Sequence, residues 1–368
     1  MIKVCHVTSA HPQEDVRIFH KECVSLAKAG YDVYLVQQGT SYEKDGVHLV
    51  GFGSIAENRI KRMLRTTKAA YRAAREVDAD VYHLHDPELL PYGLKLSRLG
   101  KTVIFDSHEH TAEAILEKEW LPFWIRGLIY RLYGKYQARI CGKIAGVISV
   151  TPNIVAYFEK ISRRVCQVAN YPIIDQQNMP EPAVGSQIVF AGGISRQWNH
   201  HVILQALEKL PQCRYCLCGI VDSGYLESLK ALPGWNQVDY LGKIPHKQVA
   251  QEMAQSGIGV ALLTPGQNTD WERGTIGNTK IFEQMQAGLP VICTDFILWR
   301  EFVERYHCGI CVDPTDPEQI VSAVRYLQEH PEEADQMGRN GQRAIMEEFN
   351  WGVEEKKLLA LYEDILKN

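Results

Sequence analysis

The stretch from Gly277 to Asp295 constrains the fold more than any other part of the chain. Asn278 or Thr279 can cap a helix, apolar residues follow at helical spacing, and Gly288 stands where a helix C-cap is expected. Residues 289–293 are then a short apolar run, typical of a buried strand. A helix that leads through one glycine into such a strand predicts an α/β unit with a parallel sheet.

Two charged residues lie near the start of this predicted helix. The ammonium of Lys280 can neutralise the phosphates of a leaving nucleotide, and the helix N-terminus favours the same anion. The carboxylate of Glu283 can accept both hydrogen bonds from a ribose diol. The stretch therefore predicts a site for a nucleotide diphosphate.

The 368 residues suffice for two domains, and the composition is that of a globular protein, not of a nucleic-acid binder. Residues 1–172 hold 24 Lys and Arg against 18 Asp and Glu, whereas the rest hold 16 against 26. No apolar run reaches the roughly 20 residues that span a bilayer, and the first residues lack a signal-peptide pattern. We expect a cytoplasmic protein whose Cys-x-x-Cys pairs (213/216 and 308/311) are buried thiols and not zinc ligands.

The first half begins with a predicted strand over residues 2–9, a polar loop to Asp15, a helix through Ala29 and a second strand over 31–36. Asp15, Arg17, His20 and Lys21 form a polar cluster at the helix entrance. They form either an ordinary charged first turn or part of a binding cleft on the acceptor side.

Polar residues follow two later strands. Residues 81–84 lead into Asp86, and residues 102–105 lead into His108 and Glu109. The carboxyl ends of strands in open α/β sheets border the ligand crevice, so these side chains are expected at one site. A metal bound by residues 108–110 is disfavoured, because successive residues at a strand end diverge.

Two stretches are basic. A predicted helix over residues 59–75 and an aromatic stretch from Trp120 to Tyr133 either pack against the domain or dock it on an anionic membrane. Their basic and aromatic residues are Arg59, Lys61, Arg62, Arg65, Lys68, Arg72, Arg75, Trp120, Trp124, Arg126, Tyr130, Arg131 and Tyr133.

The alternation of strands and helices restarts after a linker at residues 170–172. A predicted strand over 187–190 is followed by Gly192 and Gly193, which let the backbone approach a phosphate. A long polar loop over 264–277 then precedes the helix that carries Lys280, and a helix from about residue 350 ends the chain.

The stretch Asn278 to Val291 resembles the signature of the retaining glycosyltransferases of family 4, in which a phrase N-K-x-F-E-x-M-x-x-G-x-P-V carries the ribose-binding glutamate. The runs V-Y-H-L-H-D-P-E, D-S-H-E and W-R-E resemble the same family, of bacterial polysaccharide type. The chain departs at Thr275, where the family has a glutamate that contacts the donor sugar, and Arg196 stands near the family's arginine.

The resemblance implies a GT-B fold: two Rossmann-like α/β/α domains with parallel sheets facing an interdomain cleft. It places an acceptor-side domain at 1–172, a nucleotide-sugar domain at 173–349 and a helix over 350–368 that returns to the first domain. It implies catalytic roles for Lys280, His108 and Arg196 without a metal or other cofactor. Implied donor-binding residues are Glu283, Gly192, Gly193, Thr275, Asn278, Thr279, Lys243 and Ile244, and acceptor-side candidates are Asp15, Arg17, His20, Asp86 and Glu109.

The expected function is transfer of a sugar with retention, from a nucleotide-sugar (UDP favoured over GDP) to a glycan or lipid-linked acceptor in surface polysaccharide synthesis. The protein is expected in the cytoplasm, either free or at the inner face of the membrane. Two alternatives stay open. One is a nucleotide-sugar 2-epimerase of the same fold. The other is a silent binding subunit, because Thr275 replaces the sugar-contacting glutamate.

Overall fold

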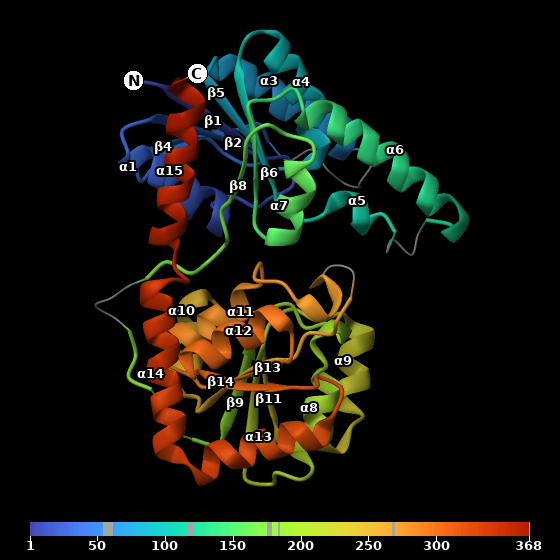
Figure 1. Ribbon diagram of the computed structural model, residues 1–368, viewed down its shortest axis with the longest axis vertical. Coiled ribbons are helices and arrows are strands. Elements are labelled where there is room, and N and C mark those ends of the chain that lie inside the picture. Colours follow the sequence, from blue (N-terminus) through green and yellow to red (C-terminus); the bar gives the residue numbers. More distant parts are fainter. Residues whose placement is uncertain (54–61, 117–120, 175–178, 183–184, 267–268, 368) are drawn as a thin grey trace. The chain divides into compact units, whose positions relative to one another are not determined.

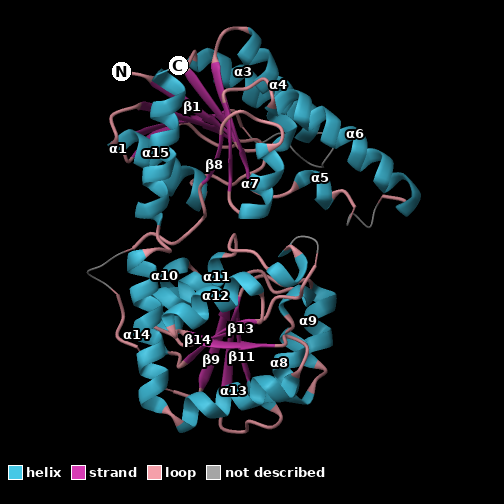
Figure 2. Cartoon of the chain, in the orientation of Figure 1, coloured by secondary structure: helices cyan, strands magenta, loops and turns pink. Residues whose placement is uncertain are grey.

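The computed structural model describes residues 1–53, 62–116, 121–174, 179–182, 185–266 and 269–367 (Figure 1). The chain forms two compact units. Unit 1 comprises Met1–Asn170 and Trp351–Asn368, and unit 2 comprises Tyr171–Asn350. The chain passes from one unit to the other within the predicted linker at 170–172. In each unit helices cover both faces of a sheet (Figure 2), so the predicted α/β/α fold is confirmed.

Unit 1 contains an eight-stranded sheet with the order β3-β4-β2-β1-β5-β6-β7-β8. The strands are parallel except β3, which is antiparallel to β4. The bounds are β1 (Lys3–Val7), β2 (Asp32–Gln37), β3 (Tyr42–Lys44), β4 (Val47–Gly51), β5 (Val81–Leu84), β6 (Thr102–Ser107), β7 (Gly146–Ser149) and β8 (Val165–Gln167).

Two apolar clusters hold helices on opposite faces of this sheet. On one face Leu90, Ile140 and Phe158 pack from three helices, and on the other Phe19 and Leu358 pack from two. The helices of the first face are α3 (Thr67–Val77), α4 (Leu90–Arg98), α6 (Phe123–Cys141) and α7 (Pro152–Glu159), and those of the second are η1 (Val16–Cys23), α1 (Val24–Lys28) and α15 (Trp351–Lys367). The short helices η2 (Arg62–Thr66), η3 (Pro87–Leu89) and α5 (Thr111–Ala114) complete the unit.

Two features of unit 1 differ from the predictions. The first helix starts as a π-helix, η1, before it continues as α1. The hairpin of β3 and β4 was not predicted, although Asp45 and Gly46 at its turn both have positive φ and form a recognised hairpin signal. The predicted basic helix over 59–75 begins outside the described residues, and its described part forms η2 and α3. Trp120 of the predicted aromatic stretch also lies outside the described residues.

Unit 2 contains a six-stranded parallel sheet with the order β11-β10-β9-β12-β13-β14. Its strands are β9 (Gln187–Ala191), β10 (Arg214–Cys218), β11 (Val238–Gly242), β12 (Ile258–Ala261), β13 (Val291–Thr294) and β14 (Gly309–Val312). Its helices are η4 (Arg196–Trp198), α8 (His200–Leu207), α9 (Ser223–Lys230), η5 (Pro233–Gln237), α10 (His246–Gln255), η7 (Trp271–Arg273), α11 (Thr279–Gln286), α12 (Ile297–Tyr306), α13 (Pro317–Glu329) and α14 (Pro331–Glu347).

Helix α11 is fixed to the sheet by its buried side. Ile281 and Met285 are fully buried, and the amide of Gln284 donates a 2.8 Å hydrogen bond to the carbonyl of Val260 on β12. Gly288 ends the helix with φ of 77°, as the sequence predicted, and β13 follows. Lys280 and Glu283 are partly exposed on the opposite side of the same helix.

Candidate active site

The donor-side candidates of unit 2 gather where the strand order changes direction, between β9 and β12. Crevices at such points bind ligands in open α/β sheets. Gly192 follows β9 directly and has φ of 150°, and a Cβ added there would lie 2.0 Å from Cε of Lys280. A glycine at this position thus lets the lysine side chain lie across the strand end.

Lys280 occupies the first turn of α11. Asn278 caps this helix by accepting a 3.1 Å hydrogen bond from the backbone amide of Lys280, and Thr279 is its first residue. The ammonium lies 4.8 Å from the ring centroid of Trp198. Burial lowers the pKa of Lys280, and the charge of Glu283 opposes that shift. A phosphate placed here would stabilise the protonated ammonium.

Arg196 and Glu283 lie at the same end of the unit. Arg196 is exposed on η4, two residues before Trp198, with its guanidinium 4.8 Å from the ring centroid of Tyr225. Glu283 is partly exposed on α11, one turn after Lys280. The exposed Gly193 links β9 to η4. Two cations, one carboxylate and a glycine turn therefore share the carboxyl edge of this sheet.

The remaining donor-side candidates lie in loops at this edge. The Thr275 hydroxyl accepts a 3.1 Å hydrogen bond from the amide of Gly277, and its carbonyl accepts one of 2.7 Å from the Trp299 indole. These two bonds fix the shape of the loop that contains Thr275. Lys243 and Ile244 follow the edge strand β11. Lys243 is exposed and Ile244 packs partly against the core.

A buried ion pair in unit 1 positions His108. Arg17 donates hydrogen bonds of 2.9 and 3.1 Å to the two oxygens of Asp106, and its third nitrogen donates one to the carbonyl of Val168. The Asp106 carboxylate also lies 2.9 Å from Nε2 of His108, whose side chain is 21% exposed. Although burial raises the pKa of Asp106, the Arg17 and His108 charges hold it well below its usual value. Arg17 is itself buried, so its side chain anchors Asp106 instead of facing an acceptor.

Asp86 and Asp15 organise the loop after β1. Asp86 is buried and accepts hydrogen bonds from the Thr8 hydroxyl at 2.9 Å and the Ser9 amide at 2.6 Å. Asp15 caps η1 by accepting from the amides of residues 17 and 18. His11, which sequence reasoning missed, lies 3.4 Å from Asp15 and stacks edge-on against His108. Its place in the polar loop after a strand was the available signal.

The other acceptor-side candidates are more open. Glu109 is exposed beyond β6, and its carbonyl accepts a 3.0 Å hydrogen bond from Ser107. His20 is half-buried on η1, with its ring against Phe19. The structure thus brings His108, Asp86 and Asp15 together around the loop after β1.

A second group that sequence reasoning missed lies beneath this loop. His6, His83 and His85 are buried around the carboxylate of Glu22. Burial lowers the pKa of each histidine, to about 4 for His85, and raises that of Glu22. The alternation His-Leu-His at the end of β5 was the signal, because residues two apart along an extended chain share a face.

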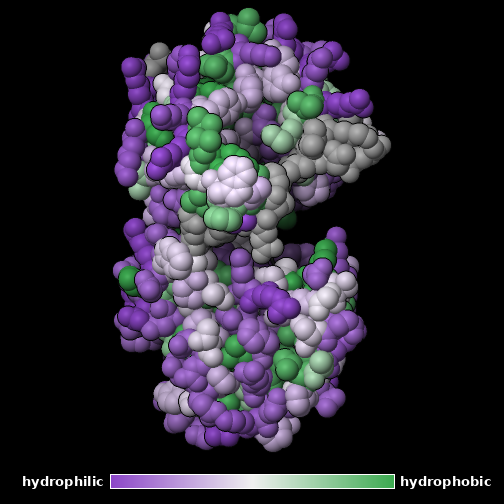
Figure 3. Space-filling view, turned by 90° about the vertical axis from the view of Figure 1, so that its right-hand side faces the viewer, coloured by the Kyte–Doolittle hydropathy of each residue, from purple (hydrophilic) through white to green (hydrophobic). Residues whose placement is uncertain are grey.

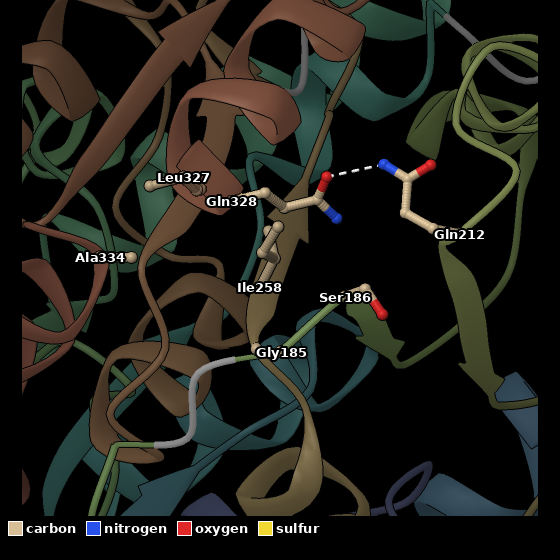
Figure 4. A pocket seen from close by; sticks show the side chains of 8 residues that line it. Gly185, Ser186, Gln212, Ile258, Leu327, Gln328 and Ala334 are labelled. Carbon is tan, nitrogen blue, oxygen red and sulfur yellow. Dashed lines mark hydrogen bonds between the residues drawn. The ribbon is translucent and has the colours of Figure 1, made fainter. Parts of the chain in front are cut away.

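A cavity of about 340 Å³ in unit 2 lies elsewhere. Gly185 and Ser186 precede β9, and Ile258 begins β12, so the cavity lies at the amino ends of these strands (Figure 4). The amide of Gln212 donates a 2.8 Å hydrogen bond to Gln328 beside it. This is the opposite edge of the sheet from Gly192, so the cavity is not the candidate donor site.

The fold and these two edges define a two-domain protein with one Rossmann-like sheet in each domain. The family model "Glycosyltransferase Family 4" matches residues 17–170, and the model "Glycosyl transferases group 1" matches residues 175–344. Together they cover most of the chain, which belongs to the glycosyltransferases of the GT-B fold.

Individual relatives agree with this assignment. The D-rhamnosyltransferase WbpZ of Pseudomonas aeruginosa is 22% identical over 240 residues, a match that spans 60% of each chain. Sucrose-phosphate synthase from Thermosynechococcus elongatus has a TM-score of 0.73 at 16% identity, with all of both chains covered. Anabaena HepE, solved with UDP and glucose, has a TM-score of 0.70 at 15% identity, covering 99% of this chain and all of its own. None of the described helices combines the length and the hydropathy of a membrane-spanning segment.

Proposed function

We propose that the protein transfers a sugar, with retention at the anomeric carbon, from a nucleotide-sugar to a glycan or lipid-linked acceptor in surface polysaccharide synthesis. A UDP-sugar is the favoured donor. The observation that carries the proposal is the packing of the Lys280 side chain over Gly192 at the end of β9, beside Glu283. An ammonium, a glycine turn and a carboxylate at that edge match the phosphates and ribose of such a donor.

The chemistry assigned to unit 2 is electrostatic. Departure of the nucleotide diphosphate leaves negative charge on its phosphates, which Lys280, Arg196 and the turn at Gly192 and Gly193 would stabilise. Glu283 would hold the ribose diol, and the edge at Lys243 and Ile244 would border the base. Because two cations neutralise the phosphates in this scheme, it needs no metal at the donor.

The groups assigned to unit 1 lie around His108. Asp106 holds Nε2 of this histidine, which leaves Nδ1 for an acceptor or sugar hydroxyl. His11 packs edge-on against this histidine and itself lies 3.4 Å from Asp15 and 3.7 Å from Asp86. HepE, with UDP and glucose bound in a structure of similar fold, supports a uridine donor, and WbpZ supports transfer of a sugar.

The test is incubation of the protein with a panel of UDP- and GDP-sugars, with and without glycan and polyprenyl-linked acceptors. Nucleotide release that depends on acceptor, with the anomeric configuration of the donor kept in the product, is the expected result. Isomerisation of the donor without acceptor would identify an epimerase instead. Binding without any turnover would favour the silent subunit, for which Thr275 and its loop bonds are the motivating observation.

The same function favours contact with a membrane through α6. This helix exposes apolar side chains at Trp124 (73%), Leu128 and Leu132, with Arg131 and Lys135 exposed among them. Figure 3, which views the side toward which α6 projects in Figure 1, shows apolar side chains exposed in this part of unit 1. Such a surface would insert apolar groups below anionic headgroups.

Flotation with liposomes tests this contact. Wild-type protein is expected to bind vesicles that contain anionic lipid and to lose binding in Trp124→Ser/Leu128→Ser. Arg131→Glu/Lys135→Glu should lose it chiefly for anionic vesicles. Unchanged flotation of both variants would leave α6 with no part in membrane binding.

A further inference from the structure

The polar core of unit 1 contains four side chains whose arrangement suits a metal ion. His6 lies on β1, His83 lies on β5, His85 directly follows β5, and Glu22 lies on η1. All four are buried, and one potential ligand atom of each lies within 4.8 Å of the others. β1 and β5 are neighbours, with His6 in register with His83, so the sheet brings the three rings to one face.

The geometry around Glu22 is nearly symmetrical. Its Oε2 lies 3.9 Å from Nδ1 of His6, 3.9 Å from Nε2 of His83 and 3.9 Å from Nε2 of His85. Nδ1 of His6 and Nε2 of His85 lie 2.9 Å apart and share a hydrogen bond, which the ion would replace. Four ligand atoms at about 2.0–2.2 Å from a tetrahedral Zn²⁺ would be about 3.3 Å apart. Among the described residues, Oε2 of Glu22 and Nε2 of His83 have no hydrogen-bond partner. Buried polar atoms without partners are costly, and a bound ion removes that cost.

The outer nitrogens of the histidines are supported as metal ligands usually are. The Tyr362 hydroxyl, from α15, lies 2.9 Å from Nδ1 of His83 and 3.5 Å from Nε2 of His6. An oxygen of Asp106 lies 3.5 Å from Nδ1 of His85. Metal-bound histidines commonly direct their second nitrogen to such carboxylates or hydroxyls, which fix the tautomer.

We propose that His6, Glu22, His83 and His85 bind one transition-metal ion, Zn²⁺ by preference, inside unit 1. Imidazole nitrogens and one carboxylate oxygen are a donor set typical of zinc. Oε1 of Glu22 lies 3.0 Å from Arg17, so the carboxylate serves the ion with one oxygen and the arginine with the other.

The ion has a positioning role and does not touch the nucleotide. It ties β1, η1 and β5 together and, through Tyr362, holds α15 on the sheet. It also fixes His85, whose Nδ1 lies 3.4 Å from Nε2 of His108. The ion thereby sets the orientation of the Asp106–His108 pair. The inference does not depend on the proposed function, because its test measures metal binding.

The experiment uses the untagged full-length protein, stripped with a chelator and dialysed against Zn²⁺ or Co²⁺. The expected result is one tightly bound ion per chain by elemental analysis, visible bands of four-coordinate Co²⁺, and a raised melting temperature. Glu22→Gln and His83→Gln should weaken binding by more than about 100-fold, and Tyr362→Phe by about 10- to 100-fold.

His200→Gln is the matched control. His200 is a buried histidine of unit 2 that contacts the Tyr215 hydroxyl at 2.9 Å and belongs to neither candidate metal cluster among the described residues. This variant should keep the full metal content. Wild-type protein that binds no ion, or an ion bound equally by wild type, Glu22→Gln and His83→Gln, would overturn the proposal. The wild-type measurement decides the matter even if a variant fails to fold.

Discussion

Each unit contains an arginine that binds an aspartate through two nitrogens, and the two pairs differ in burial. Arg17 and Asp106 in unit 1 have 4% and 0% of their side chains exposed, whereas Arg214 and Asp239 in unit 2 have 47% and 45%. The difference extends to the whole units. Unit 1 buries charges and histidines under the ends of its strands, and unit 2 keeps the charged groups assigned to the donor at the rim of an apolar core.

This contrast indicates different roles for the carboxyl edges of the two sheets. In unit 1, charged side chains hold one another, so that His108 and the loop after β1 keep one geometry. In unit 2, Lys280 and Arg196 contact aromatic rings and are placed to meet an incoming anion. A fully hydrogen-bonded buried network holds side chains in one position, whereas cations at the rim stabilise the negative charge of a ligand that binds and dissociates.

The largest expected effect is the difference in stability lost when the buried and the exposed arginine pair are each broken. Arg17→Met removes the bidentate partner of the buried Asp106 and should lower the free energy of unfolding by about 3–5 kcal/mol. Arg214→Met removes an exposed pair and should cost about 0–1 kcal/mol. Urea denaturation of both variants measures the difference. Equal losses would refute the contrast between the units.

The second effect concerns the rim cation of unit 2. Lys280→Ala should lower kcat by about 100- to 1000-fold, because the ammonium stabilises charge that develops on the leaving phosphates. Steady-state kinetics with the best donor of the panel provide the measurement. Lys230→Ala, which removes an exposed lysine paired with Glu227, is the control and should leave kcat unchanged. Wild-type turnover in Lys280→Ala would remove the phosphate role.

A smaller effect is expected at the ribose. Glu283→Gln should weaken binding of UDP by about 10- to 100-fold, since a hydrogen bond to a charged group contributes about 1.5–3 kcal/mol. Isothermal titration calorimetry measures this loss. A uridine diphosphate without the ribose hydroxyls should bind wild type and variant equally. If Glu283→Gln weakened the binding of UDP and of that analogue to the same extent, Glu283 would not be the ribose ligand.

The smallest effect is a pH dependence in unit 1. Burial lowers the pKa of His11, but the Asp15 hydrogen bond and the charges of Asp86, Asp15 and Asp106 raise it above 6.5 overall. A raised folded-state pKa stabilises the protein below the unfolded value, and that stability is lost as pH rises through the folded value. Wild type should therefore lose stability relative to His11→Gln as pH increases above 6.5. Parallel stability curves for the two proteins would contradict this.

The sequence predicted the donor edge better than the acceptor edge. Helix α11, its Asn278 cap and the positive φ of Gly288 follow from local signals that lie next to one another in the chain. The buried cluster of unit 1 combines His6, Glu22 and His83 from three separate elements. Strand register brings the two histidines together, and Glu22 comes from the helix η1, so no local pattern in the sequence predicts the group. Arg17 shows the same limit, because a charged first turn gives no sign that its partner is Asp106, far along the chain.

The most direct test is a crystal structure of the protein with UDP bound. The account predicts the diphosphate within hydrogen-bond distance of the Lys280 ammonium, over Gly192, and the ribose hydroxyls at the Glu283 carboxylate. Density for UDP at any other place, such as the cavity beside Gln212 and Gln328, would contradict it.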